Sequence, residues 1–225
     1  FVRETVIFDE WAQMLANKGF LVLQPQYRGS KGYGQRFYQI AFSKGGQGGY
    51  KMQDDKDDGV AWAVAEGLAS SDRVAMFGWS YGGYAALVAA SRTPQIYQCV
   101  IAGAAVTDPE MQVNYYRYRL RGRSKVEQLR MWDDSVAPIN EVEQVNVPIL
   151  LIHGTVDQRV PLDHAKKYRR ALLKAEKDHS YLELKGADHF SNTLFFDHKL
   201  SLYASILDYL SGDCGIGTVT SVAVR

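Results

Sequence analysis

A glycine-rich turn carries the strongest chemical signal in this sequence. Residues 78–83 read Gly-Trp-Ser-Tyr-Gly-Gly and lie between a predicted strand at 73–78 and a predicted helix at 81–91. A serine on such a strand-to-helix turn exposes its hydroxyl above the end of the sheet, as an activated nucleophile requires. The turn is tight, so we expect a Cβ atom at Gly78 or Gly82 to collide with the packed helix and strand. Ser80 is therefore the candidate nucleophile.

An acid and a base follow in the order Ser, acid, His. Asp157 comes in the loop after a predicted strand at residues 147–153, and His189 comes after the last predicted strand at 181–184. In such a trio the histidine takes the serine proton, while the carboxylate fixes the tautomer and stabilises the imidazolium. The other four histidines lie on strands or helices or before the last strand, and we interpret them as structural or solvated: His153, His164, His179 and His198.

Acyl transfer through Ser80 needs two hydrogen-bond donors that stabilise a tetrahedral oxyanion. The backbone N–H of Tyr81, at the start of the predicted helix, supplies one of them. The sequence suggests no metal site and no organic cofactor. The acidic run at residues 54–58 lacks the spacing and the terminal glutamate of a calcium loop, so we interpret it as the charged start of a helix. The predicted chemistry is hydrolysis by a serine nucleophile.

The elements around these residues predict an α/β fold with a mostly parallel sheet and helices on both faces. Short apolar runs alternate with amphipathic helical patterns along the whole chain. Strands are predicted at residues 20–24, 73–78, 97–106, 147–153 and 181–184. Helices are predicted at residues 10–18, 54–67, 81–91 and 194–210, with one more that opens at Pro161. A length of 225 residues with 46% hydrophobic content fits one domain over residues 1–225.

Charge and composition argue against several classes of partner. The formal charge is +1, so nucleic acid is not an expected partner. The Tyr- and Arg-rich run at 115–123 is interpreted as a solvated helix face beside the pocket rather than an RNA-binding patch. No stretch reaches the ~18–20 apolar residues that span a membrane, so we expect a soluble protein. Cys99 and Cys214 are interpreted as two free thiols. The compartment stays open, with cytoplasm favoured over periplasm or secretion.

The sequence resembles the prolyl oligopeptidase family of serine peptidases, in the branch of the dipeptidyl peptidases and acylaminoacyl-peptidases. The resemblance rests on residues 27–34, 78–83, 153–160 and 186–189. It implies an α/β-hydrolase fold and cleavage of short peptides or of N-terminal, including acylated, residues. It also implies that Arg159 holds a substrate backbone carbonyl. By the same resemblance, the pocket for the residue before the scissile bond is lined by Tyr81, Val106, Tyr116 and Val160.

The resemblance also implies parts of the family that these 225 residues do not contain. In the family a β-propeller precedes the hydrolase domain, and a strand lies between those predicted here at 20–24 and 73–78. The loop after that strand carries a tyrosine whose hydroxyl is the second oxyanion donor. A missing inner strand leaves backbone groups unpaired, at roughly 1–3 kcal/mol for each buried group. We therefore expect an upstream segment of the same enzyme to supply these parts.

Two other functions are compatible with the same residues. A carboxylesterase uses the same nucleophile, acid and base, and differs in its preferred leaving group. A catalytically inactive hydrolase-like module that serves in binding or assembly is favoured by the missing oxyanion segment. The sequence leaves the preferred residue at the cleavage site and the oligomeric state open.

Overall fold

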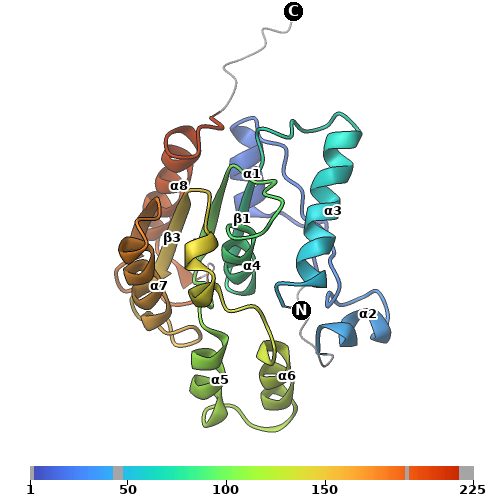
Figure 1. Ribbon diagram of the computed structural model, residues 1–225, viewed down its shortest axis with the longest axis vertical. Coiled ribbons are helices and arrows are strands. Elements are labelled where there is room, and N and C mark those ends of the chain that lie inside the picture. Colours follow the sequence, from blue (N-terminus) through green and yellow to red (C-terminus); the bar gives the residue numbers. More distant parts are fainter. Residues whose placement is uncertain (1–2, 43–47, 191–192, 218–225) are drawn as a thin grey trace, which may run out of the picture.

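A parallel sheet of four strands forms the centre of the computed structural model, which describes residues 3–42, 48–190 and 193–217 (Figure 1). The strands follow one another across the sheet in chain order, and each pairs in parallel with the next. They are β1 (Ala75–Trp79), β2 (Cys99–Gly103), β3 (Ile149–Gly154) and β4 (His179–Leu184). The carboxyl ends of all four strands therefore lie at one edge, and the expectation of a mostly parallel sheet is confirmed.

Helices connect the strands and cover both faces of the sheet. Those that pack on or beside it are α1 (Glu10–Asn17), α3 (Lys51–Ala65), α4 (Tyr81–Ala89), α7 (Asp163–Lys174) and α8 (Phe196–Ser211). The other described α-helices are α2 (Gln35–Gln39), α5 (Pro109–Arg117) and α6 (Gly122–Trp132). In Figure 1, α5 and α6 project below the sheet, from its carboxyl edge. In the described parts of the chain, no helix is both long and apolar enough to cross a membrane.

The side chains of the central strands alternate between two cores. On β2, Val100 and Ala102 belong to a core formed with α4 and α7, whereas Ile101 belongs to a second core formed with α8. On β3, Leu151 and Ile152 divide in the same way. This alternation follows from the two-residue period of a strand. Because both faces are covered, β2 and β3 are buried along their whole length.

The first predicted helix forms close to its expected bounds. The Asp9 carboxylate caps α1 by accepting a hydrogen bond of 2.9 Å from the N–H of Ala12. The chain leaves the helix at Gly19, whose φ of 84° suits a residue without a side chain. The glycine after the end is the signal from which the end of this helix was predicted, and the structure adds the Asp9 cap at its start.

The acidic run at 54–58 lies in the first half of α3 and makes ion pairs. Asp54 and Asp57 pair with Arg92 at 2.6 and 3.3 Å. Asp55 pairs with Arg28. These contacts connect α3 to the segment after α4 and to the loop around Arg28. The charged start of a helix is confirmed, and its carboxylates also hold neighbouring segments.

The strand predicted at residues 20–24 does not form. Among the described residues β1 pairs only with β2, so β1 is an edge strand and the segment at 20–24 has no strand beside it. Leu21 and Leu23 are 59% and 41% exposed. The prediction was wrong because an apolar run becomes a strand only when a neighbour satisfies its backbone donors and acceptors.

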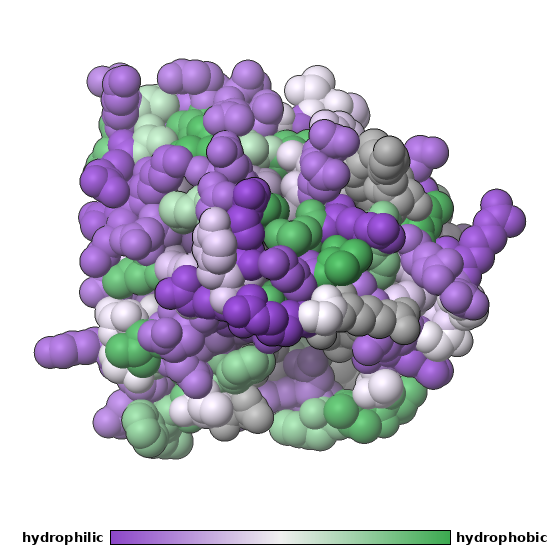
Figure 2. Space-filling view, turned by 90° about the horizontal axis from the view of Figure 1, so that it is seen from below, coloured by the Kyte–Doolittle hydropathy of each residue, from purple (hydrophilic) through white to green (hydrophobic). Residues whose placement is uncertain are grey.

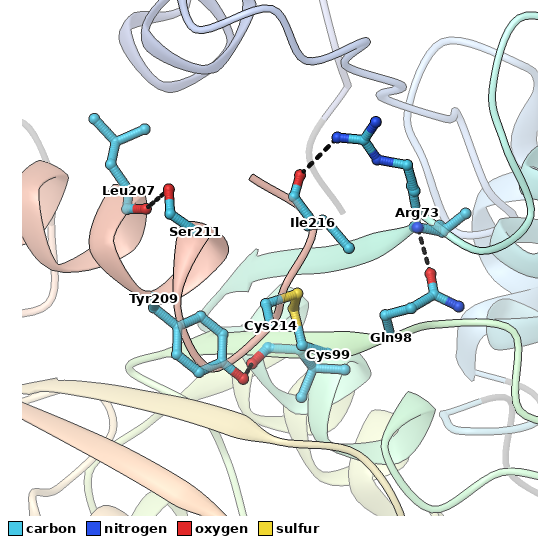
Figure 3. Close-up of a disulfide and its surroundings, with 10 residues drawn as sticks. Arg73, Gln98, Cys99, Leu207, Tyr209, Ser211, Cys214 and Ile216 are labelled. Atoms are coloured by element: carbon cyan, nitrogen blue, oxygen red, sulfur yellow. Dashed lines mark hydrogen bonds between the residues drawn. A yellow bond between two sulfur atoms is a disulfide. The ribbon is translucent and has the colours of Figure 1, made fainter. Parts of the chain in front are cut away.

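The two cysteines form a disulfide, so the expectation of free thiols is wrong (Figure 3). Cys99 begins β2 and Cys214 follows α8, with 5.3 Å between their Cα atoms. Their exposed fractions are 0% and 8%. The hydroxyl of Tyr209 on α8 also donates to the carbonyl of Val100, at 3.3 Å. Two cysteines 115 residues apart give no spacing signal, because only the path of α8 across the sheet brings them together.

Replacing both cysteines with alanine is expected to lower the free energy of unfolding by about 2–4 kcal/mol, because the unfolded chain regains the freedom of a long loop. Urea denaturation of the double variant and of wild type measures this loss. Wild type treated with a reductant is the control, and its midpoint should move toward that of the variant. Equal midpoints for oxidised wild type and the double variant would contradict the prediction.

Candidate active site

Ser80 occupies a strained turn between β1 and α4. Its φ is 60° and its ψ is −114°, a conformation that non-glycine residues rarely adopt. Its N–H donates to the carbonyl of Gly103 at 2.8 Å, and its carbonyl accepts from the N–H of Tyr84 at 3.0 Å. Hydrogen bonds on both sides thus hold the turn in place and fix the direction of the Ser80 side chain.

Close backbone contacts explain two of the glycines around Ser80. A Cβ atom on Gly78 would lie 2.1 Å from the carbonyl oxygen of Gly82, as predicted. A Cβ atom on Gly82 would meet nothing within 4 Å, so the expected collision there is wrong. The second crowded position is Gly83, where a Cβ atom would lie 2.4 Å from the carbonyl oxygen of Gly103. Gly82 instead provides the backbone that Gly78 approaches.

The structure brings the three predicted residues into one hydrogen-bonded line. The Nε2 atom of His189 lies 2.8 Å from the hydroxyl oxygen of Ser80, and its Nδ1 atom lies 2.7 Å from Oδ2 of Asp157. Since a carboxylate can only accept, the hydrogen on His189 resides on Nδ1 and Nε2 accepts from Ser80. His189 and Asp157 are each 5% exposed. The imidazole is therefore oriented as a base toward the serine.

The surroundings of Asp157 keep its carboxylate ionised. Burial by itself raises the pKa of Asp157, but the hydrogen bond from His189 and two backbone donors outweigh it and hold the pKa below its usual value. The backbone donors are the N–H groups of Arg159 and Val160, each 2.8 Å from Oδ1. The carboxylate is thus both fixed in position and negatively charged at neutral pH.

Backbone contacts hold the Asp157 loop against the His189 loop. The N–H of Val156 donates to the carbonyl of Ala187 at 3.0 Å, and the N–H of Gly186 donates to the Thr155 hydroxyl at 2.7 Å. The indole N–H of Trp79, beside Ser80, donates to the carbonyl of His189 at 2.8 Å. The acid, the base and the nucleophile are therefore positioned by the backbone as well as by their own side chains.

A second histidine contacts the Asp157 loop. His153, on β3, is 1% exposed, and its Nε2 atom donates to the carbonyl of Val160 at 2.9 Å. The same nitrogen lies 3.6 Å from Oδ2 of Asp157. Burial lowers the pKa of His153, so the ring is neutral near pH 7. This structural role agrees with the sequence interpretation, but the position of His153 behind Asp157 was not predicted. The sequence signal for it is the four-residue spacing of His153 and Asp157.

The three remaining histidines make other contacts. His164 is buried on α7, where its Nδ1 atom accepts from the N–H of Thr107 at 3.2 Å, and burial lowers its pKa to about 3. The rings of His179 and His198 bond to backbone carbonyls, at 2.8 and 2.9 Å. These contacts agree with the structural interpretation of all three.

Three of the four predicted pocket residues share one apolar cluster. Val106 and Val160 are each 2% exposed and pack with Tyr81 in this cluster, which also contains Tyr84 and Trp132. The fourth, Tyr116, lies on α5 and is 7% exposed. Burial raises its pKa, while the nearby charge of Arg159 opposes that rise. Arg159 itself is exposed.

Helix α5 is attached to the loop that carries Asp157, and this attachment was not predicted. Gln112, one turn before Tyr116, is fully buried and donates from Nε2 to the carbonyl of Arg159 at 2.9 Å. The hydroxyl of Tyr115 donates to the carbonyl of Gln158 at 2.5 Å. The sequence signal for this attachment is the four-residue spacing of Gln112 and Tyr116, which places both on one face of a helix. The run at 115–123 is also not one helix face, because α5 ends at Arg117 and α6 begins at Gly122.

A buried lysine packs behind Tyr81. The Nζ atom of Lys56, on α3, lies 3.5 Å from the ring centroid of Tyr27, and that ring stacks on Tyr81 with centroids 6.2 Å apart. Nζ donates to the carbonyl of Met52 at 2.6 Å. Burial lowers the pKa of Lys56 to about 7, against the charges of Asp55 and Asp57. No sequence pattern distinguishes this lysine from its acidic neighbours.

Comparisons with known proteins agree with this geometry. Residues 7–215 match the model of the prolyl oligopeptidase family. The chain belongs to this family. It is 31% identical over 170 residues to dipeptidyl aminopeptidase BIII of Pseudoxanthomonas mexicana, which covers 71% of this chain and 24% of that protein. It is 33% identical over 194 residues to dipeptidyl peptidase family member 6 of Caenorhabditis elegans, which covers 80% of this chain and 25% of that protein.

A solved structure of a family member has the same fold. The acylaminoacyl peptidase of Pyrococcus horikoshii superimposes with a TM-score of 0.72 at 20% identity, over 88% of this chain and 33% of that one. The α/β-hydrolase fold expected from the sequence is therefore confirmed. The chain spans about a quarter of the length of the curated relatives it matches.

Replacing Lys56 with methionine is expected to stabilise the fold most at and below pH 7. The folded pKa of about 7 lies below the ordinary 10.5, so between these values the unfolded chain binds a proton that the folded chain does not. The free energy of unfolding of wild type should therefore rise with pH across this window. Urea denaturation at pH 7 and pH 10 measures the slope, which Lys56→Met should flatten. The exposed Lys166→Met control should keep the wild-type slope, and an equal slope in Lys56→Met would refute the assignment.

Replacing His153 with leucine is expected to slow the reaction of Ser80 with a fluorophosphonate by about tenfold, because the loop that holds Asp157 loses a buried hydrogen bond. His153→Gln is the matched control, since its amide can still donate to Val160 and should restore most of the rate. Circular dichroism establishes that both variants are folded. A folded His153→Leu protein that reacts at the wild-type rate would show that the bond does not position Asp157.

Proposed function

We propose that this protein is a serine peptidase that forms an acyl-enzyme on Ser80. The observation that carries the proposal is the line from the Ser80 hydroxyl through His189 to Asp157, with contacts of 2.8 and 2.7 Å. Membership of the prolyl oligopeptidase family supports a peptide as the substrate. No metal or organic cofactor is part of the proposed reaction.

In the proposed mechanism, His189 accepts the Ser80 proton as the serine oxygen attacks the peptide carbonyl. The imidazolium, stabilised by Asp157, then returns this proton to the leaving amine as the C–N bond breaks. Water attacks the resulting ester by the same route in reverse and releases the acid. The backbone N–H of Tyr81, at the first position of α4, donates to the oxyanion. A second donor is proposed to come from a tyrosine on an upstream segment of the same enzyme.

The proposed substrates are short peptides or N-terminal residues, including acylated ones. The names of the relatives, a dipeptidyl aminopeptidase and an acylaminoacyl peptidase, support this class. In the proposal, the residue before the scissile bond binds against Tyr81, Val106, Tyr116 and Val160. Arg159 is exposed beside them and holds a substrate backbone carbonyl. The apolar cluster that joins Tyr81, Val106 and Val160 supports an apolar residue at that position.

The active enzyme is proposed to include a further strand beside β1 and a β-propeller that restricts entry to short peptides. In the described part of the chain, the open edge of β1 and the apolar segment at 20–24, which forms no helix or strand, support the strand. We further propose that the enzyme works in an oxidising compartment, either periplasmic or extracellular. The buried disulfide between Cys99 and Cys214 supports this location over the cytoplasm, where such bonds are rare.

Replacing Ser80 with alanine is expected to prevent covalent labelling by a fluorophosphonate, because, among the residues that the structure describes, Ser80 supplies the hydroxyl that is bonded to His189. Intact mass of the labelled protein measures the adduct, and circular dichroism establishes folding. Ser91→Ala is the control, since Ser91 lies just after α4 and its hydroxyl donates to the carbonyl of Val88. An adduct on folded Ser80→Ala would disprove the assignment of the nucleophile.

Substrate assays with the wild-type protein distinguish the proposed peptidase from a carboxylesterase and from an inactive binding module. An aminoacyl anilide and a short-chain aryl ester compare leaving groups directly. Hydrolysis of both supports a peptidase, whereas hydrolysis of the ester alone supports a carboxylesterase. If the full-length, folded protein forms no adduct on Ser80 and hydrolyses neither compound, the inactive binding module is the correct reading.

A further inference from the structure

The helical hairpin α5–α6 is strongly basic in a chain that is close to neutral. Residues 109–132 contain six basic and two acidic residues, a net charge of +4, whereas the whole chain has a formal charge of +1. The rest of the chain is therefore net acidic. Such an asymmetry produces a local positive field that attracts anionic groups. The basic residues of the hairpin are Arg117, Arg119, Arg121, Arg123, Lys125 and Arg130.

Three arginines at the end of α5 and in the loop before α6 are available to a ligand. Arg117, Arg119 and Arg121 are all exposed. In the part of the chain that the structure describes, none of the three takes part in an ion pair with a carboxylate, although Arg28 and Arg92 do. Unpaired guanidinium groups are well suited to carboxylates, which they bind through two parallel hydrogen bonds.

Arg119 is held in place before any ligand binds. Its guanidinium carbon lies 4.0 Å from the ring centroid of Tyr115, and its Nη1 atom donates to the Tyr115 carbonyl at 3.4 Å. The hydroxyl of Tyr115 in turn donates to the carbonyl of Gln158, next to Asp157. A preorganised arginine loses less conformational freedom on binding than a free surface arginine does. Arg119 is thus connected through one tyrosine to the loop of the candidate active site.

The hairpin lies on the same side of the molecule as the proposed catalytic residues. Both helices project from the carboxyl edge of the sheet, where the loops of Ser80, Asp157 and His189 also begin (Figure 1). Figure 2 looks onto this end of the molecule, where hydrophilic side chains cover much of the surface. Tyr116 of α5 belongs to the proposed pocket. A peptide bound there would have its neighbouring residues within reach of the arginines.

We infer that the α5–α6 hairpin binds carboxylate groups of the substrate, so that the enzyme prefers acidic peptides over neutral ones. Aspartate or glutamate side chains within a few residues of the scissile bond would pair with Arg119 and its exposed neighbours. The inference rests on the proposed peptidase function, and it adds a substrate class to the apolar pocket. Arg119 selects the substrate through charge and takes no part in the proton transfer.

Matched peptide substrates test this inference in the full-length protein. Each pair differs only by glutamate or glutamine at one position near the scissile bond. We expect the ratio of kcat/KM, glutamate over glutamine, to be roughly three- to tenfold at low salt and to fall as salt screens the charges. Arg119→Gln should reduce this ratio toward one. Arg169→Gln is the matched control, because Arg169 is also exposed and stacks on a tyrosine, Tyr181 at 4.9 Å, but lies on α7.

Binding to the Ser80→Ala variant provides a readout that does not need turnover. The glutamate peptide should bind this variant several-fold more tightly than the glutamine peptide, and the added Arg119→Gln change should remove the difference. Equal affinities, or a preference unaffected by Arg119→Gln, would overturn the inference even if both peptides are cleaved. Absence of labelling and turnover in wild type would instead refute the peptidase function. Tighter binding of a short single-stranded RNA than of the acidic peptide would reassign the hairpin to nucleic acid.

Discussion

The buried hydrogen bond between His189 and Asp157 is the interaction on which the candidate site depends. It can form because β3 and β4 are adjacent and parallel, with Gly154 directly opposite Leu184 at the ends of the two strands. The loops that follow therefore begin side by side. Gly154 is essential to this approach, since a Cβ atom there would lie 2.4 Å from the carbonyl oxygen of Ala187. The chemistry of the side chains thus follows from strand register and from one close backbone contact.

The features that could be predicted from the sequence are those determined by short segments. The turn around Ser80 requires a glycine at position 78, because the backbone of Gly82, four residues later, lies against it. A contact within such a short segment can be predicted from the sequence. Asp157 and His189 could be assigned because each follows an apolar run that becomes a strand. The collision at Gly82 was predicted wrongly because the direction in which a missing Cβ would point depends on the exact path of the turn. It is Gly83, on the next position, that faces β2.

The features that could not be predicted are those created by distant segments. The disulfide forms only because α8 returns across the sheet to the start of β2, and no local pattern encodes that return. The position of His153 behind Asp157 depends on the fold of the loop between them. The strand predicted at 20–24 failed for the same reason. Its apolar pattern is that of a strand, but strand pairing depends on two segments and cannot be predicted from one of them. β1, which carries the Ser80 turn, is correspondingly less buried than β2 and β3.

In the proposed peptidase, two parts of the molecule have different roles. Loops at the strand ends hold the reacting groups, and their geometry is over-determined by backbone hydrogen bonds, so little variation is compatible with the chemistry. The α5–α6 hairpin lies outside the sheet and is attached to the Asp157 loop through Gln112 and Tyr115. Its exposed side chains can therefore differ without disturbing the positions of His189 or Asp157. The net charge of +1 is the sum over the basic hairpin and the acidic remainder of the chain, so it gives no indication of the basic surface on the hairpin. In the proposed enzyme, the electrostatics of the attached hairpin therefore select the substrate, while the loops at the strand ends carry out the reaction.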